Sequence, residues 1–132
     1  SEVRAFAEQL GVQTSQLLIG GRSMGGRMCS MAVADETDPL DVAALVLMSY
    51  PLHPPKKPEN LRTEHLPRIT VPTLCLAAEH DRTAPPAVME RMAQKIPGAR
   101  YACLSGAGHV LHYEQPEAFN AELEKFLKDV KP

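Results

Sequence analysis

Three residues whose side chains could together catalyse acyl transfer follow one another along the chain in the order serine, aspartate, histidine. Ser23 lies in the stretch GRSMG, which matches the pattern G-x-S-x-G, while Asp81 ends the stretch AAEHD and His109 ends the stretch GAGH. A serine hydroxyl attacks a carbonyl carbon only when a base takes its proton, and a carboxylate holds that base in the correct tautomer. The types and order of these residues predict Ser23 as nucleophile, His109 as general base and acid, and Asp81 as the residue that orients it.

The pattern G-x-S-x-G is typical of a sharp turn between a strand and a helix, with the serine at its apex. In such a turn the backbone N–H of Met24 would donate a hydrogen bond to the oxyanion of the tetrahedral intermediate. Simpler interpretations stay open, because Ser23 could be an ordinary turn residue and His109 an ordinary loop histidine. Asp81 could merely cap the helix that follows it, and Glu79 could compete for the role of the acid.

Two further residues could contact a substrate. His53, in YPLHPP, follows an apolar run, and Arg22 in the elbow could neutralise a substrate carboxylate, although a solvated arginine fits equally well. We expect no metal and no cofactor, because the histidines and cysteines lack the spacing of a zinc site and no phosphate-binding loop is present.

The elements that must position these residues alternate between strands and helices. Apolar runs predict strands at 16–20, 43–48, 73–78 and 100–104, and helical periodicity predicts helices at 2–10, 24–34, 85–96 and 116–129. This alternation indicates an α/β fold, a parallel sheet of about four strands with helices on both faces. Function in such a sheet collects at the carboxyl ends of the strands, which is where the three candidate residues fall.

Composition limits the class of protein further. The 132 residues suit a single domain, and the net charge of −2 with scattered lysines and arginines favours neither nucleic acid nor a membrane surface as partner. No apolar run is long enough to span a membrane. The three separated cysteines predict buried, reduced thiols and therefore a cytoplasmic protein. The six methionines are expected to fill the core.

Taken together, the stretches GRSMGG, AAEHD and GAGHVLHYEQPEAF resemble the α/β-hydrolase superfamily. The loop YPLHPPKKPENLRTEHL is similar to a small, lidless dienelactone-hydrolase-like branch, which includes a testis-expressed protein and a subunit of a histone-acetyltransferase complex. The resemblance implies a serine esterase that forms an acyl-enzyme on an ester or related carbonyl substrate through Ser23, His109 and Asp81. Because that branch includes a complex subunit, the rival expectation is a non-catalytic interaction module or an inactive fragment.

The resemblance also implies that this domain is the carboxyl half of the full fold. The sheet of the family usually has about eight strands, and the elbow follows the fifth of them. The amino-terminal strands and the loop that supplies the second oxyanion N–H would then lie outside this chain. We therefore expect the strand Gln16–Gly20 to form a sheet edge, covered by a missing amino-terminal segment or by a second copy in a homo-oligomer.

Overall fold

A single parallel sheet forms the centre of the computed structural model, which describes residues 2–50 and 63–130. Its strands lie side by side in sequence order: β1 (Leu18–Arg22), β2 (Ala44–Met48), β3 (Thr73–Ala78) and β4 (Arg100–Leu104). The described helices are α1 (Glu2–Leu10), α2 (Met24–Val33), α3 (Pro86–Lys95), α4 (Leu111–Glu114) and α5 (Pro116–Asp129), with 3-10 turns η1 (Thr14–Gln16) and η2 (Leu66–Arg68). The predicted α/β class with four parallel strands is confirmed.

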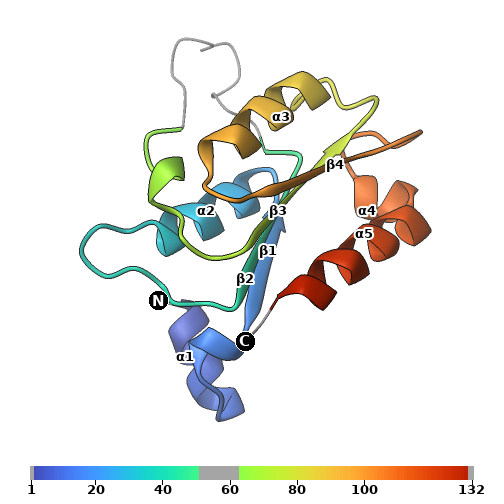
Figure 1. The fold of residues 1–132 in the computed structure, drawn as a ribbon. Coiled ribbons are helices and arrows are strands. Elements are labelled where there is room, and N and C mark those ends of the chain that lie inside the picture. Colours follow the sequence, from blue (N-terminus) through green and yellow to red (C-terminus); the bar gives the residue numbers. More distant parts are fainter. Residues whose placement is uncertain (1, 51–62, 131–132) are drawn as a thin grey trace.

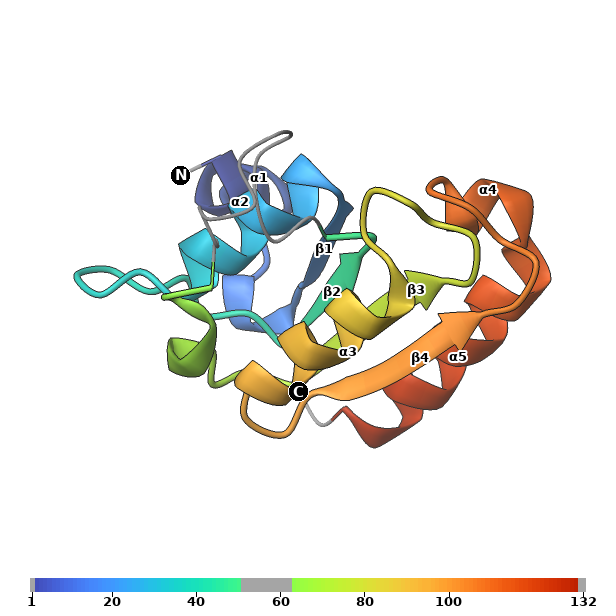
Figure 2. The same cartoon turned by 90° about the horizontal axis from the view of Figure 1, so that it is seen from above.

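Helices cover both faces of this sheet, α2 and α3 on one side and α4 with α5 on the other (Figures 1 and 2). The strand residues alternate accordingly, since Leu45 and Cys75 belong to the core on the α2–α3 side, whereas Val46 and Leu76 belong to the core beneath α5. All of β3 is buried, as expected for a parallel strand that is covered on both faces.

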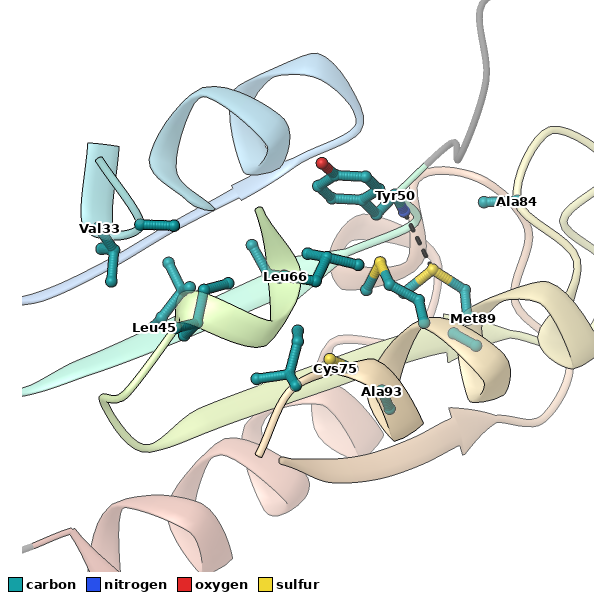
Figure 3. Packing of buried hydrophobic residues seen from close by; sticks show 14 of the residues in the cluster. Val33, Leu45, Tyr50, Leu66, Cys75, Ala84, Met89 and Ala93 are labelled. Carbon is teal, nitrogen blue, oxygen red and sulfur yellow. Dashed lines mark hydrogen bonds between the residues drawn. The ribbon is translucent and has the colours of Figure 1, made fainter. Parts of the chain in front are cut away.

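The core on the α2–α3 side contains a buried polar group as well as the apolar side chains of Figure 3. The Ser30 hydroxyl lies 2.8 Å from His65 Nε2, and the fully buried Tyr50 places its hydroxyl 3.4 Å from Ser30 Oγ. Burial, together with the positive charges of Arg27 and Arg68, lowers the pKa of His65. The imidazole is therefore held in its neutral form inside the fold.

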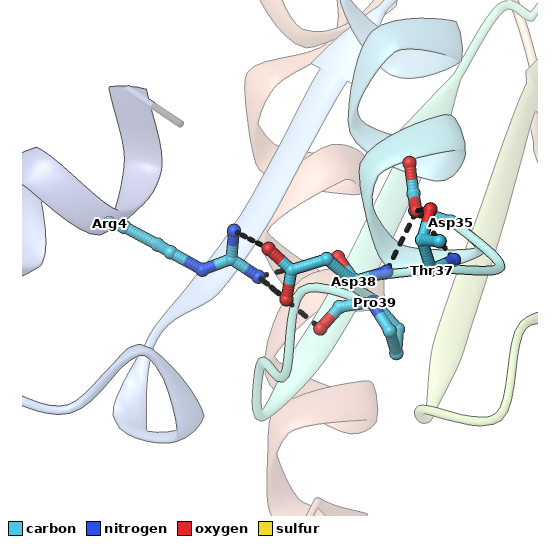
Figure 4. A network of polar contacts seen from close by, with 5 residues as sticks. All are labelled: Arg4, Asp35, Thr37, Asp38 and Pro39. Atoms are coloured by element: carbon cyan, nitrogen blue, oxygen red, sulfur yellow. Dashed lines mark hydrogen bonds and ion pairs between the residues drawn. The ribbon is translucent and has the colours of Figure 1, made fainter.

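Helix α1 is joined to the loop after α2 by an exposed ion pair (Figure 4). Two guanidinium nitrogens of Arg4 donate to the two carboxylate oxygens of Asp38, at 2.8 and 3.0 Å. Asp35 shapes this loop, because its Oδ1 accepts the backbone N–H groups of Thr37 and Asp38, both at 2.9 Å. An ion pair that is open to water contributes about 0–1 kcal/mol, so this contact orients α1 more than it stabilises the fold.

The predicted element boundaries agree with the structure to within one residue except at the first strand. The prediction of a strand at 16–20 was wrong at both ends, because residues 14–16 form η1 and the pairing with β2 continues to Arg22. Gly20 lies in β1 as predicted, and a Cβ there would lie only 2.7 Å from the Val46 carbonyl oxygen. The short elements η2 and α4 were not predicted.

Strand β1 forms one edge of the described sheet, since it pairs only with β2. Large apolar side chains are exposed on β1 and on the helices before and after it: Phe6, Leu10, Leu18, Met24, Met28 and Met31. The prediction that the methionines fill the core was therefore wrong for those of α2, although Met89 and Met92 are fully buried. The prediction of buried cysteines holds for Cys75, whereas Cys103 is exposed.

Candidate active site

The carboxyl ends of the four strands bring together the residues that the sequence singled out. Ser23 follows β1, Asp81 follows β3 after a short turn, and His109 lies in the loop after β4. Ser49 follows β2, between the strand that carries Ser23 and the strand that carries Asp81. In a parallel sheet all these ends share one edge, so a single substrate could reach the whole group.

Ser23 has the backbone conformation of a strained turn. Its φ of 55° and ψ of −122° lie in a region that side-chain-bearing residues rarely occupy. The turn is held at one end by β2, because the Ser23 N–H donates to the Met48 carbonyl oxygen at 2.9 Å. Helix α2 begins directly after the turn, so the serine lies at a strand-to-helix junction.

Two glycines make this junction possible. A Cβ on Gly21 would lie 2.4 Å from the Gly25 carbonyl carbon, and a Cβ on Gly26 would lie 2.7 Å from the Gly21 carbonyl oxygen. A Cβ on Gly25, the last position of G-x-S-x-G, would meet no other part of the described fold within 4 Å. In the described structure the close approach of strand and helix therefore depends on Gly21 and Gly26 rather than on both glycines of the motif.

Asp81 and His109 form a hydrogen-bonded pair, with 3.0 Å between Asp81 Oδ2 and His109 Nδ1. The second oxygen of Asp81, Oδ1, accepts the backbone N–H groups of Thr83 and Ala84 at 2.9 and 3.1 Å. Burial alone would raise the pKa of Asp81. The hydrogen bonds from His109 and Ala84, the nearby Ser49 hydroxyl and the charge of His109 outweigh it, so the pKa of Asp81 is lowered. An ionised carboxylate therefore faces the imidazole.

Asp81 does not cap α3, because the N-cap of that helix is Pro85, which has no side-chain cap hydrogen bond. Its Oδ1 instead accepts N–H groups in the turn before the helix, while Oδ2 faces the imidazole. Glu79 is not placed to compete for the imidazole. Its Oε1 accepts the Gly106 N–H at 3.0 Å and lies 3.1 Å from Nε2 of the exposed His80.

The nucleophile and the base are not joined directly. The described residues include no hydrogen bond to the Ser23 hydroxyl, and hence none between Ser23 and His109. Catalytic hydrogen bonds are often long in unliganded enzymes and tighten when substrate binds. Met24 is the first residue of α2, where backbone N–H groups have no acceptor within the helix, so its N–H is available to an anion.

The weaker candidates have fewer contacts to support them. Arg22 ends β1 beside the elbow, paired in register with Met48. His53 lies outside the described residues. Sequence reasoning missed Ser49, a buried residue with φ of 48° whose hydroxyl helps to lower the pKa of Asp81 without a well-formed hydrogen bond. Its place directly after a strand was the available signal.

An open hollow of about 650 Å3 adjoins Asp81 and is lined by Glu79, His80, Asp81, Arg82, Pro85 and Pro86. Ser23 and His109 do not line it, so we do not assign it to the substrate. Within residues 2–50 and 63–130, no three histidine, cysteine, aspartate or glutamate side chains cluster as a metal site. No helix in that part of the chain is long and apolar enough to cross a membrane.

Residues 1–130 match the sequence profile of a family described as "Alpha/beta hydrolase domain". The chain belongs to the α/β-hydrolase family. Among curated relatives of this α/β hydrolase, polyketide synthase ThaQ of Burkholderia thailandensis is 37% identical over 67 residues, which are 51% of this chain and 3% of ThaQ. BpoC of Mycobacterium tuberculosis, assigned as a non-heme bromoperoxidase, is 32% identical over 74 residues, 56% of this chain and 28% of BpoC.

Solved structures share the fold of this α/β hydrolase. An esterase from Thermogutta terrifontis superposes with a TM-score of 0.82 at 22% identity, covering 98% of this chain and 71% of the esterase. A CIB-like hydrolase from Thermoplasma acidophilum gives a TM-score of 0.79 at 24% identity, with 98% and 57% covered. The chain therefore spans a little over half of that hydrolase, and likeness at these identities concerns the fold.

Proposed function

We propose that this α/β hydrolase cleaves an ester or related carbonyl compound through an acyl-enzyme on Ser23. The observation that carries the proposal is the 3.0 Å hydrogen bond between His109 Nδ1 and Asp81 Oδ2. It leaves the other ring nitrogen of His109, Nε2, free to act as the base. The strained turn at Ser23 supports the same interpretation, because it places a serine at the carboxyl ends of the strands, where Asp81 and His109 also lie.

The proposed reaction has two halves. Nε2 of His109 takes the Ser23 proton while the serine oxygen bonds to the carbonyl carbon, and the resulting oxyanion accepts the Met24 N–H. Collapse of this intermediate breaks the ester bond, with His109 giving its proton to the leaving alcohol. Water, deprotonated by His109, then releases the acid and restores Ser23. The ionised Asp81 stabilises the imidazolium in both halves.

Substrate class and setting are further parts of the proposal. The proposal includes Arg22 and His53 as residues that contact the substrate. It also includes a substrate range like that of dienelactone hydrolases, since a substrate carboxylate beside the ester group would suit Arg22. The structure neighbours include an esterase and an enol-lactonase from Burkholderia xenovorans, which share the fold at 22% and 19% identity. Three free cysteines suit a reducing compartment, and we propose the cytoplasm.

Intact mass after incubation with a fluorophosphonate tests the proposal. We expect one adduct on the chain, lost in Ser23→Ala and retained in Ser15→Ala, because Ser15 is an exposed serine in η1 away from the site. We expect His109→Ala to slow labelling strongly, since general-base catalysis typically contributes about 10²–10⁴-fold. A folded chain that gains no adduct, or an adduct that survives Ser23→Ala, would refute the proposed mechanism.

A second candidate function is that of an interaction module. The exposed apolar side chains beside β1 favour it, as does a hollow of about 220 Å3 next to that strand, lined by Gln16, Leu18, Ala43, Ala44, Leu127 and Val130. A sheet edge with apolar flanks is a ready site for another strand. The partner would be a second copy of the chain or an amino-terminal segment that also brings the second oxyanion N–H.

Sedimentation velocity separates the possible partners. A dimer at micromolar concentration that dissociates in Leu18→Lys, but not in the control Lys128→Glu on α5, would identify a second copy. A monomer that stays unlabelled by the fluorophosphonate, and becomes labelled when extended at its amino terminus, would identify the segment. A monomer with full serine reactivity would argue against any required partner.

A further inference from the structure

The Glu114 side chain holds the backbone on both sides of His109. Its Oε1 accepts the Gly108 N–H and its Oε2 accepts the Val110 N–H, each at 3.1 Å. Glu114 is the last residue of the short helix α4, which begins directly after the loop that carries His109. We infer that Glu114 is a positioning residue that fixes the direction of the His109 imidazole, an inference that rests on the proposed function.

Other contacts hold this loop before His109, and after it the Val110 carbonyl oxygen accepts the backbone N–H groups of Tyr113 and Glu114 at 3.1 and 3.0 Å. The Gly106 N–H donates to Glu79 Oε1 at 3.0 Å, and the Ala107 carbonyl oxygen accepts the His80 N–H at 2.9 Å. Among the contacts of residues 2–50 and 63–130, the imidazole itself is held by Asp81, through Nδ1. A single hydrogen bond to a ring leaves its tilt undetermined, so the direction of Nε2 depends on the backbone on either side of His109. In the described part of the chain, Glu114 supplies the acceptors for both neighbouring N–H groups.

A glycine permits this close contact. A Cβ on Gly108 would lie 3.1 and 3.2 Å from the two carboxylate oxygens of Glu114, tighter than an ordinary contact. Gly108, the residue before His109, therefore leaves room for the Glu114 carboxylate that holds this loop. An ionised carboxylate makes stronger hydrogen bonds than a neutral amide, and it offers two acceptor oxygens where glutamine offers one.

The test compares Glu114→Ala and Glu114→Gln with Glu124→Ala, which removes the same charge from an exposed position of α5. The rate of fluorophosphonate labelling at Ser23 is the first measurement. A misplacement of about 1 Å can slow catalysis by about 10²-fold, so we expect a loss of about tenfold or more in Glu114→Ala. Glu114→Gln keeps one acceptor and should fall in between, while Glu124→Ala should label at the unmodified rate.

The second measurement does not depend on activity. NMR resonances of the His109 ring should be shifted or broadened in Glu114→Ala and unchanged in Glu124→Ala. The amide hydrogens of Gly108 and Val110 should also exchange faster in Glu114→Ala. Normal labelling in a folded Glu114→Ala would overturn the inference and leave the proposed function intact. Where the unmodified chain is not labelled, the proposed function fails, and unchanged His109 resonances in Glu114→Ala would then overturn the inference separately. Should the alanine variant not fold, Glu114→Gln decides by the same measurements.

Discussion

Gly25 and Gly26 are adjacent in sequence, and we expect alanine to affect stability in opposite directions at the two positions. Both lie in the first turn of α2, where alanine in place of glycine favours the helix by up to about 1 kcal/mol. A Cβ at Gly25 meets nothing within 4 Å, whereas a Cβ at Gly26 would lie 2.7 Å from the Gly21 carbonyl oxygen. Gly25→Ala should therefore be neutral or stabilising, and Gly26→Ala destabilising.

The magnitude follows from the contact at Gly26. Carbon–oxygen contacts in proteins are normally about 3.3 Å or longer, so α2 would have to move from the end of β1 by about 0.6 Å. Overpacking of this kind typically costs about 1–3 kcal/mol. Because the helix propensity change is shared by both variants, the difference between their free energies of unfolding should equal that cost. The contact involves backbone atoms, which cannot turn aside as a flexible side chain could.

Urea unfolding followed by far-UV circular dichroism measures this difference. For a slope of about 2 kcal/mol per molar urea, the two variants should have midpoints about 0.5–1.5 M apart. Equal slopes in both variants would show that the change lies in stability rather than in the compactness of the unfolded chain. The reasoning fails if Gly25→Ala is destabilised as much as Gly26→Ala, because another segment would then lie against Gly25.

Three further predictions concern titratable groups. The lowered pKa of His65 means that the unfolded chain binds a proton first, so stability should fall as the pH drops below about 6.5, and less so in His65→Gln, as urea midpoints across pH will show. Because the pKa of Asp81 is lowered in the folded chain, its ionised carboxylate stabilises the fold above the ordinary pKa of about 3.9. This stabilisation is lost as the pH falls through the folded pKa, so the stability of Asp81→Asn should approach that of the unmodified chain below pH 4. Burial raises the pKa of Cys75 to about 12, so a thiol reagent should modify the exposed Cys103 in the folded chain and Cys75 only after unfolding, which peptide mass mapping will distinguish.

The neighbourhood of Asp81 and His109 could be expected from the sequence because it depends on connectivity. Each residue follows an apolar run, and the two runs are consecutive strands separated by one helix. Parallel strands joined by a right-handed crossover commonly lie side by side, which brings their carboxyl ends together. The hydrogen bond of 3.0 Å between the two side chains is what this arrangement allows.

The supporting contacts could not be expected, because they depend on distances that no local pattern encodes. Ser49 resembles any residue at a strand end, and Glu114 resembles any glutamate near a helix start, until the fold places them beside Asp81 and the His109 loop. The motif G-x-S-x-G includes Gly25, whereas the close contact is made by Gly26, which lies outside it. Which glycine meets a backbone atom is decided by how closely α2 crosses the end of β1.

Ser23 is supported by less of the described fold than Asp81. Asp81 follows β3, which lies inside the sheet with every residue buried, and it holds His109, which follows the other edge strand, β4. Ser23 follows β1, an edge strand paired on one side only and flanked by exposed apolar side chains. Strand edges with few buried contacts open more readily than the core of a sheet. Under the proposal that a partner covers β1, we therefore expect the distance from Ser23 to His109 to depend on that partner, so that serine reactivity and the oligomeric state change together.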